Sequence, residues 1–170
     1  NYSLRSLWFK KITQFRCKKK GRMIYNHNIL EVHDLKTYFY TSRGVVKAVD
    51  GVSFELKKGE TLGLVGESGC GKSITCLSVM RLVPRPAGRI VGGRVLLEGE
   101  DLLKKSEKEM TRIRGRRITM ILQDPMMSLN PLFTIGEQVA EPIRIHQKLG
   151  KLAVWEKVIE MLRLVRIPSP

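Results

Sequence analysis

The feature that most constrains the fold is the glycine-rich stretch at residues 66–73, which reads Gly-Glu-Ser-Gly-Cys-Gly-Lys-Ser. It fits the spacing G-x-x-x-x-G-K-[ST], in which a short loop joins a strand to the first turn of a helix. Its glycines allow the backbone to turn tightly, so that consecutive N–H groups point into one concavity. The dipole of the following helix adds partial positive charge at the same point. The stretch therefore predicts a cradle for the phosphates of a nucleoside triphosphate.

The side chains at the end of this stretch predict two further roles. Lys72 would reach the β- and γ-phosphates as a cation, and the Ser73 hydroxyl would ligate Mg²⁺. The helix is predicted to open near Gly71, and Ile74 in its first turn completes the set. The candidate nucleotide-binding residues are Gly66, Glu67, Ser68, Gly69, Cys70, Gly71, Lys72, Ser73 and Ile74.

The neighbouring segments have the patterns that a phosphate loop requires. Residues 61–65 are short and mostly apolar, which predicts a buried strand. Residues 74–83 carry apolar side chains at helical spacing and are followed by Pro84, which predicts a helix that ends there. A glycine-rich turn that arose by chance would need neither a strand before it nor a helix after it. The phosphate loop is therefore the favoured interpretation.

A second informative segment is residues 118–125, Ile-Thr-Met-Ile-Leu-Gln-Asp-Pro, which predicts another buried strand ending in a polar loop. Ligands gather at the carboxyl ends of strands in open α/β sheets, so we expect Gln123 and the phosphate loop to meet at one site. A neutral amide there could contact Mg²⁺ or an attacking water without adding charge. Gln123 is therefore a candidate catalytic residue with Lys72, and a candidate metal ligand with Ser73.

These stretches together resemble the ATP-binding subunit of an ABC transporter. Residues 123–138, Gln-Asp-Pro-Met-Met-Ser-Leu-Asn-Pro-Leu-Phe-Thr-Ile-Gly-Glu-Gln, are similar to the group that imports oligopeptides, dipeptides and nickel, as are residues 48–54 and 59–69. The resemblance covers about residues 29–170. It implies an α/β fold with a phosphate-loop NTPase core of the RecA-like type, here incomplete. An N-terminal antiparallel β layer would precede the core, and the start of a helical subdomain would follow it.

The resemblance also implies roles for particular residues. Gln123 would touch the metal and the γ-phosphate and signal their presence to the membrane subunits. An aromatic residue before the phosphate loop would stack on adenine; Phe39 aligns best by spacing, Tyr40 next, and Tyr38 is a third candidate. Packing within a strand is the alternative role for each of them. The implied cofactors are ATP and Mg²⁺.

For the whole protein, the resemblance implies a transport ATPase that couples ATP binding and hydrolysis to the import of peptides or nickel. Its partners would be transmembrane permease subunits, a second ATP-binding subunit in a homo- or heterodimer and, indirectly, an extracytoplasmic solute-binding protein. No nucleic-acid partner is expected, and the location would be the cytoplasmic face of the plasma membrane. Residues 128–137 would contact the permease, with ordinary helix packing as the alternative.

Three motifs that the family needs do not occur in residues 23–170. These are the Leu-Ser-Gly-Gly-Gln signature, the Walker B strand that ends in Asp-Glu, and the later switch histidine. We therefore expect residues 23–170 to form a partial ATP-binding domain that stops before the signature motif. Hydrolysis is expected of a full-length subunit rather than of these residues alone, because the water-orienting carboxylate is missing.

Residues 1–22 form a basic extension whose charged side chains are all cationic. Apolar residues at helical spacing between them are typical of a helix on an anionic membrane surface. A nucleic-acid-binding arm would look similar. A translated leader or cloning remnant before Met23 is the third interpretation, and the one we favour. The cationic residues are Arg5, Lys10, Lys11, Arg16, Lys18, Lys19, Lys20 and Arg22.

Other segments predict the remaining elements. Residues 29–56 are β-rich with turns at 42–44 and 57–59, and residues 93–99 form a short strand and turn. Residues 106–115, 134–139 and 152–165 predict helices. The cysteines form no C-x-x-C pair and the histidines are scattered, so no metal site beyond Mg²⁺ is indicated. A small phosphate-loop kinase is a remaining alternative, against which the Gln-Asp-Pro segment argues.

Overall fold

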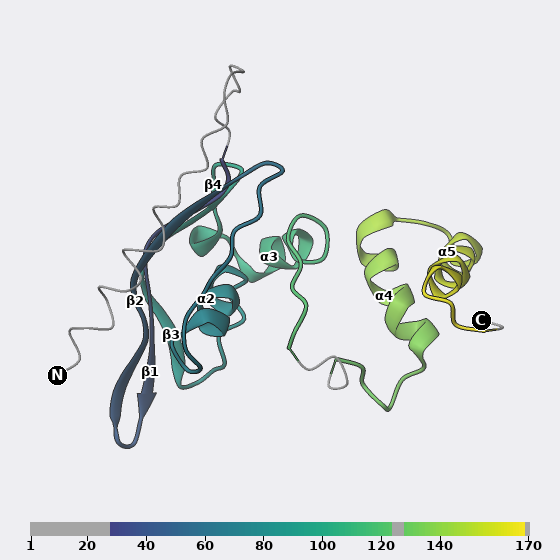
Figure 1. Cartoon of the computed structure of the whole chain (residues 1–170). Helices are drawn as coiled ribbons and strands as arrows, with labels where there is room; N and C mark the ends of the chain where they lie inside the picture. The colour runs from purple at the N-terminus through teal and green to yellow at the C-terminus, as the bar shows by residue number, and fades with distance from the viewer. Residues whose placement is uncertain (1–27, 124–127, 169–170) are drawn as a thin grey trace, which may run out of the picture. The chain divides into compact units, whose positions relative to one another are not determined.

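The computed structural model describes residues 28–123 and 128–168, and these fall into two compact units divided after Lys104 (Figure 1). The basic extension predicted for residues 1–22 lies outside the described residues. So do Asp124 and Pro125 of the second sequence motif.

The first unit is built on an antiparallel sheet of strand order β2-β1-β3-β4. Its members are β1 (Asn28–Thr41), β2 (Gly44–Lys57), β3 (Gly88–Leu97) and β4 (Glu100–Asp101). The β1–β2 hairpin turns at residues 42–43, within the turn that the sequence predicts, and Thr41 pairs with Gly44. The structure thus confirms the N-terminal antiparallel layer, and β3 is longer than the predicted strand at residues 93–99.

The pairing of the three long strands is irregular around Asp34. The pairing of β1 with β2 shifts between Val32 and Leu35, and its pairing with β3 shifts close by. Asp34, Gly51 and Gly93 all have positive φ there, at 47°, 82° and 99°. A Cβ on Gly93 would lie 2.6 Å from the Leu35 Cα, so the close approach of β1 and β3 requires glycine.

Helix α2 (Lys72–Val79) packs on the sheet, with Thr75, Ser78 and Val79 buried. Short helix η1 (Leu102–Lys104) follows β4. The sequence places the start of this helix near Gly71, and α2 does begin at Lys72; its predicted end at residue 83 is wrong, because α2 ends at Val79. Arg81 adopts a left-handed conformation with φ of 54°, which stops the helix before Pro84 does. The buried apolar side chains of the unit are Val32, Leu35, Val49, Val79, Met80, Val95, Leu97 and Leu102.

Two predicted core strands are not strands in the structure. Residues 61–65 and 118–122 form no ladder with any described strand, and most of their side chains face solvent. Val65 is 67% exposed and Ile121 is 94% exposed. A parallel strand buried on both faces needs neighbours beside it and helices on each side, and the described residues supply neither for these segments.

The second unit consists of α3 (Glu107–Ile113), α4 (Ile135–Gln147) and α5 (Lys151–Leu164). Ser106 caps α3 in a capping box with Glu109, as a helix predicted from residue 106 requires. Helices α4 and α5 pack through a core of Ala140, Ile143, Val154 and Val158 (Figure 1). The predicted helices at residues 106–115, 134–139 and 152–165 are therefore confirmed, α4 being longer than expected. Across the described residues, every helix is too short or too polar to cross a bilayer.

Candidate functional site

The glycine-rich stretch forms a loop that leads directly into α2. Gly69 and Gly71 have positive φ, at 76° and 96°, and Gly71 is the N-cap of the helix. No side chain among the described residues caps this N-terminus. The first backbone N–H groups of α2 are thus left to an external acceptor, and the helix dipole favours an anion there.

The Lys72 ammonium lies inside the loop. Its Nζ donates to the carbonyl oxygens of Gly66 and Glu67, at 2.7 Å each, and lies 3.4 Å from the Cys70 Sγ. Three contacts fix the position of a cation that would otherwise be free to rotate. The loop therefore places a positive charge beside the helix N-terminus that follows it.

Close packing explains the glycines at both ends of the loop. A Cβ on Gly66 would lie 2.6 Å from the Cys70 Sγ. A Cβ on Gly71 would lie 2.3 Å from the carbonyl oxygen of Ala48, on β2. The start of α2 is thus pressed against the sheet, and a side chain at Gly71 would push it away, whereas a side chain at Gly66 would displace Cys70 within the loop.

Ser73 and Ile74 follow Lys72 in the first turn of α2. Ser73 is exposed and Ile74 is half-buried, so the Ser73 hydroxyl is accessible to a metal ion. The described residues contain no group of three or more His, Cys, Asp or Glu side chains that could hold a metal ion. A hydroxyl beside a phosphate site suits Mg²⁺, because that ion keeps waters and takes the rest of its ligands from the phosphates.

The three candidate aromatic residues lie on two faces of β1. Thr37 contacts α2, and Phe39, two residues further on, shares that face by strand alternation. The half-buried Phe39 ring borders Gly88, where a Cβ would lie 2.9 Å from its Cε1. Tyr38 and Tyr40 point to the opposite face, and the Arg89 guanidinium lies 5.5 Å from the Tyr40 ring centre.

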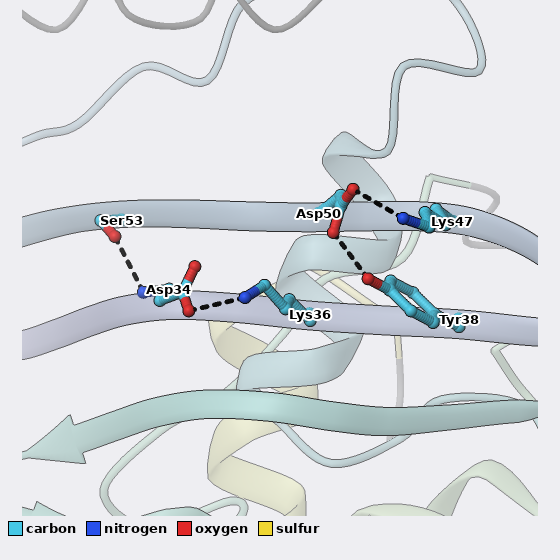
Figure 2. Close-up of polar contacts among 6 residues, drawn as sticks. All are labelled: Asp34, Lys36, Tyr38, Lys47, Asp50 and Ser53. Atoms are coloured by element: carbon cyan, nitrogen blue, oxygen red, sulfur yellow. Dashed lines mark hydrogen bonds and ion pairs between the residues drawn. The ribbon is translucent and has the colours of Figure 1, made fainter.

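That opposite face carries an exposed polar cluster, which Figure 2 shows. The Tyr38 hydroxyl donates to Asp50 Oδ1 at 2.7 Å, and Lys47 lies 3.5 Å from Oδ2. The Tyr38 hydrogen bond, together with the Lys47 charge, lowers the pKa of Asp50 below its ordinary value of 3.8. A second contact within the cluster, with Asp34, raises the pKa of Lys36. The charged groups of the polar cluster are therefore paired with one another, and the cluster lies away from the phosphate loop.

Gln123 belongs to the second unit, whereas Lys72 belongs to the first. Gln123 is exposed. Its predicted meeting with the phosphate loop stays a prediction.

The residues just before α4 form an ordered turn held by Gln138. Its side-chain oxygen accepts from the Asn130 N–H at 2.8 Å, and its Nε2 donates to the carbonyls of Asn130 and Phe133 at 2.9 and 3.0 Å. The turn presents apolar side chains to solvent: Leu132 is 86% exposed and Phe133 is 62% exposed.

Sequence reasoning missed two hydroxyl residues behind the loop. Thr37 on β1 and Ser78 on α2 are fully buried, and their hydroxyl oxygens lie 2.7 Å apart. A signal was available, because Ser78 stands between apolar residues on the helix face that also carries Thr75. A hydroxyl on a buried face needs a hydrogen-bond partner nearby.

The glycine loop, the lysine inside it and the uncapped helix that follows define a protein of the phosphate-loop class. Residues 49–169 match the ABC transporter family, and the chain belongs to that family.

Curated relatives agree with this assignment. Over 142 residues the chain is 51% identical to the probable peptide ABC transporter ATP-binding protein y4tR of Sinorhizobium fredii, covering 84% of this chain and 42% of the relative. Over 148 residues it is 49% identical to the oligopeptide transport ATP-binding protein OppD of Bacillus subtilis, covering 87% of this chain and 41% of the relative. The chain thus spans less than half the length of these relatives.

Solved structures share the fold. The chain is similar to MJ0796, a bacterial ABC transporter cassette solved as a dimer, with a TM-score of 0.66 and 20% identity over 82% of this chain and 58% of the other. A post-hydrolysis structure of the same cassette, bound to ADP and Pi, gives a TM-score of 0.67 at 19% identity, again over 82% of this chain and 58% of the other. These likenesses confirm the predicted fold class of an incomplete phosphate-loop NTPase core.

Proposed function

We propose that the chain is part of the ATP-binding subunit of an ABC transporter that imports peptides, and that residues 66–74 hold the triphosphate of ATP. The observation that carries the proposal is the position of the Lys72 ammonium, held inside a glycine loop at the uncapped N-terminus of α2. Backbone N–H groups, the helix dipole and one fixed cation together suit a triphosphate.

Each loop residue has a separate task in this proposal. Lys72 would exchange its contacts with the carbonyls of Gly66 and Glu67 for the β- and γ-phosphate oxygens. Ser73 would bind Mg²⁺ through its exposed hydroxyl. Gln123 would complete the metal site and report the γ-phosphate to the membrane subunits, as the family resemblance implies. Phosphoryl transfer depends mostly on such positioning and charge.

Phe39 is the best of the three candidates for stacking on adenine. It lies on the face of β1 that α2 covers, as the fully buried Thr37 does. Tyr40 points away from α2 and already has Arg89 against its ring. Stacking by Phe39 would place the base on the same side of the sheet as the phosphate loop.

The substrate and the partners rest on the relatives. Those described here are named as peptide transport proteins, which favours a peptide over nickel as the imported solute. Permease subunits, a second ATP-binding subunit and, indirectly, a solute-binding protein would be the partners, at the cytoplasmic face of the membrane. The exposed Leu132 and Phe133 would contribute to the permease contact. Hydrolysis coupled to transport would belong to the full-length subunit.

Calorimetric titration of the purified chain with Mg²⁺ and ATP tests the proposal. The wild-type chain should bind ATP, and Lys72→Ala should lose at least about tenfold in affinity, because a charged contact to phosphate is removed. Lys58→Ala is the matched control, since Lys58 is an exposed lysine in the turn after β2. Equal binding by wild type and Lys72→Ala would reject the phosphate loop as the site.

A further inference from the structure

The structure points to Thr37 as a positioning residue for the phosphate loop, and this inference rests on the proposed binding of ATP there. Thr37 lies on β1, far along the sequence from the loop, and is fully buried. It contacts α2 through Ser78, which is also fully buried. Neither residue belongs to the glycine-rich motif.

The direction of the hydrogen bonds follows from counting protons. The Ser78 Oγ donates to the carbonyl oxygen of Ile74 at 2.6 Å. A serine hydroxyl has a single proton, so in the 2.7 Å contact between the two hydroxyls Thr37 must be the donor. The result is a relay in which the β1 hydroxyl is bound to Ser78, and Ser78 to the first turn of α2.

The relay joins α2 to the sheet near the end of the helix, at Ser78. At the other end of the helix, Gly71 lies so close to the Ala48 carbonyl that a Cβ would approach it to 2.3 Å. The close approach at Gly71 fixes where the helix begins, and the relay at Ser78 fixes the direction of the helix axis. Because the N–H groups of the first turn point along this axis, the relay aims them at the phosphate site.

Removing the Thr37 hydroxyl should therefore affect binding of the triphosphate more than binding of the base. The Thr37→Val side chain has nearly the same shape but cannot donate, which leaves the Ser78 oxygen without its donor in a buried site. The helix can then tilt. An adenine base held by an aromatic ring on the sheet would be unaffected.

The experiment measures the affinity of the full chain for Mg²⁺–ATP by calorimetry, and for adenosine by NMR titration. Thr37→Val and Ser78→Ala should each lose roughly tenfold for ATP, with adenosine affinity unchanged. The double variant should be no weaker than either single one, because both break the same relay. Thr37→Ser keeps the hydroxyl and should restore ATP affinity to within about twofold of wild type.

Thr41→Val is the matched control, the same substitution on the same strand. Thr41 donates to the Gly44 carbonyl at the exposed hairpin turn, and its replacement should leave ATP affinity unchanged. If Thr37→Val and Ser78→Ala bind ATP as wild type does while Lys72→Ala does not, the inference is overturned and the proposed function stands. If the Lys72→Ala change has no effect either, the proposed function fails, and the inference fails with it. Equal losses of ATP and adenosine affinity would show a general loss of structure and would also overturn the inference.

Discussion

At the scale of single residues, the phosphate loop depends on glycines for two different reasons. Gly69 needs freedom of φ but has open space where a Cβ would stand. Gly71 needs both freedom of φ and the absence of a side chain, because the Ala48 carbonyl occupies that space. The sequence motif specifies glycine at position 71 but leaves position 69 open. It cannot indicate that the Ala48 carbonyl is the neighbour that makes glycine necessary at position 71.

Gly71→Ala should therefore destabilise the first unit and weaken ATP binding together. A left-handed conformation costs a non-glycine residue about 1–2 kcal/mol, and the contact with Ala48 adds to that. Urea unfolding gives the stability and calorimetry the affinity. Gly59→Ala is the control, since Gly59 has φ of 77° with nothing within 4 Å of a Cβ. A Gly71→Ala chain that matched the Gly59→Ala chain in both measurements would disprove the steric argument.

The pair of Tyr38 and Asp50 makes a prediction about pH. Hydrogen bonding from Tyr38 lowers the pKa of Asp50 below 3.8, so the folded state favours the carboxylate. Its stabilisation is present above the ordinary aspartate pKa and is lost as the pH falls through the lowered value. The Asp50 carboxyl carbon, followed by NMR, should titrate below 3.8, and Tyr38→Phe should raise its midpoint. Tyr40→Phe, on the same face of β1, should not move it.

At the scale of elements, the sequence predicts well what is local. The hairpin of β1 and β2, the capped start of α3 and the helices α4 and α5 follow from turn residues, caps and periodicity, and all form. The strands expected at residues 61–65 and 118–122 do not form, because a parallel strand depends on distant partners that periodicity does not reveal. The Thr37–Ser78 contact was missed for the same reason, since it joins residues 41 positions apart.

The turn before α4 gives an element-scale prediction. Gln138→Leu removes the hydrogen bonds that hold residues 130–133 to α4, so the Asn130 amide should exchange with solvent about tenfold faster. Hydrogen exchange followed by NMR measures this. Gln147→Leu, the same change on the same helix, removes only a contact with Lys157 and should leave Asn130 exchange unchanged. Unchanged exchange in Gln138→Leu would show that the turn is held by other contacts.

At the scale of the whole molecule, the described residues expose many apolar side chains. Ile121 is 94% exposed in the mostly apolar segment 118–122, and Val65 is 67% exposed before the loop. An extended apolar segment without a paired neighbour can pair with the same segment in a second copy. The net charge of +15 opposes such association, and high salt screens that charge.

The chain should therefore self-associate increasingly as salt is raised, and Ile121→Lys should reduce this association. The substitution removes apolar surface and adds a charge in this exposed segment. Sedimentation velocity at low and high salt measures the effect. Thr119→Lys adds the same charge at an exposed position of the same segment without removing a large apolar side chain, and should reduce association less. Equal effects of the two changes would assign the association to net charge alone.

The measurement that tests the central claim most directly is an amide NMR titration of the chain with Mg²⁺ and ATP. Binding at the phosphate loop predicts that the largest shifts fall on the N–H groups of residues 69–74, where the loop meets the uncapped N-terminus of α2. Adding EDTA should reduce these shifts if Ser73 helps to hold the metal. Shifts concentrated elsewhere, or unchanged by Lys72→Ala, would contradict the account.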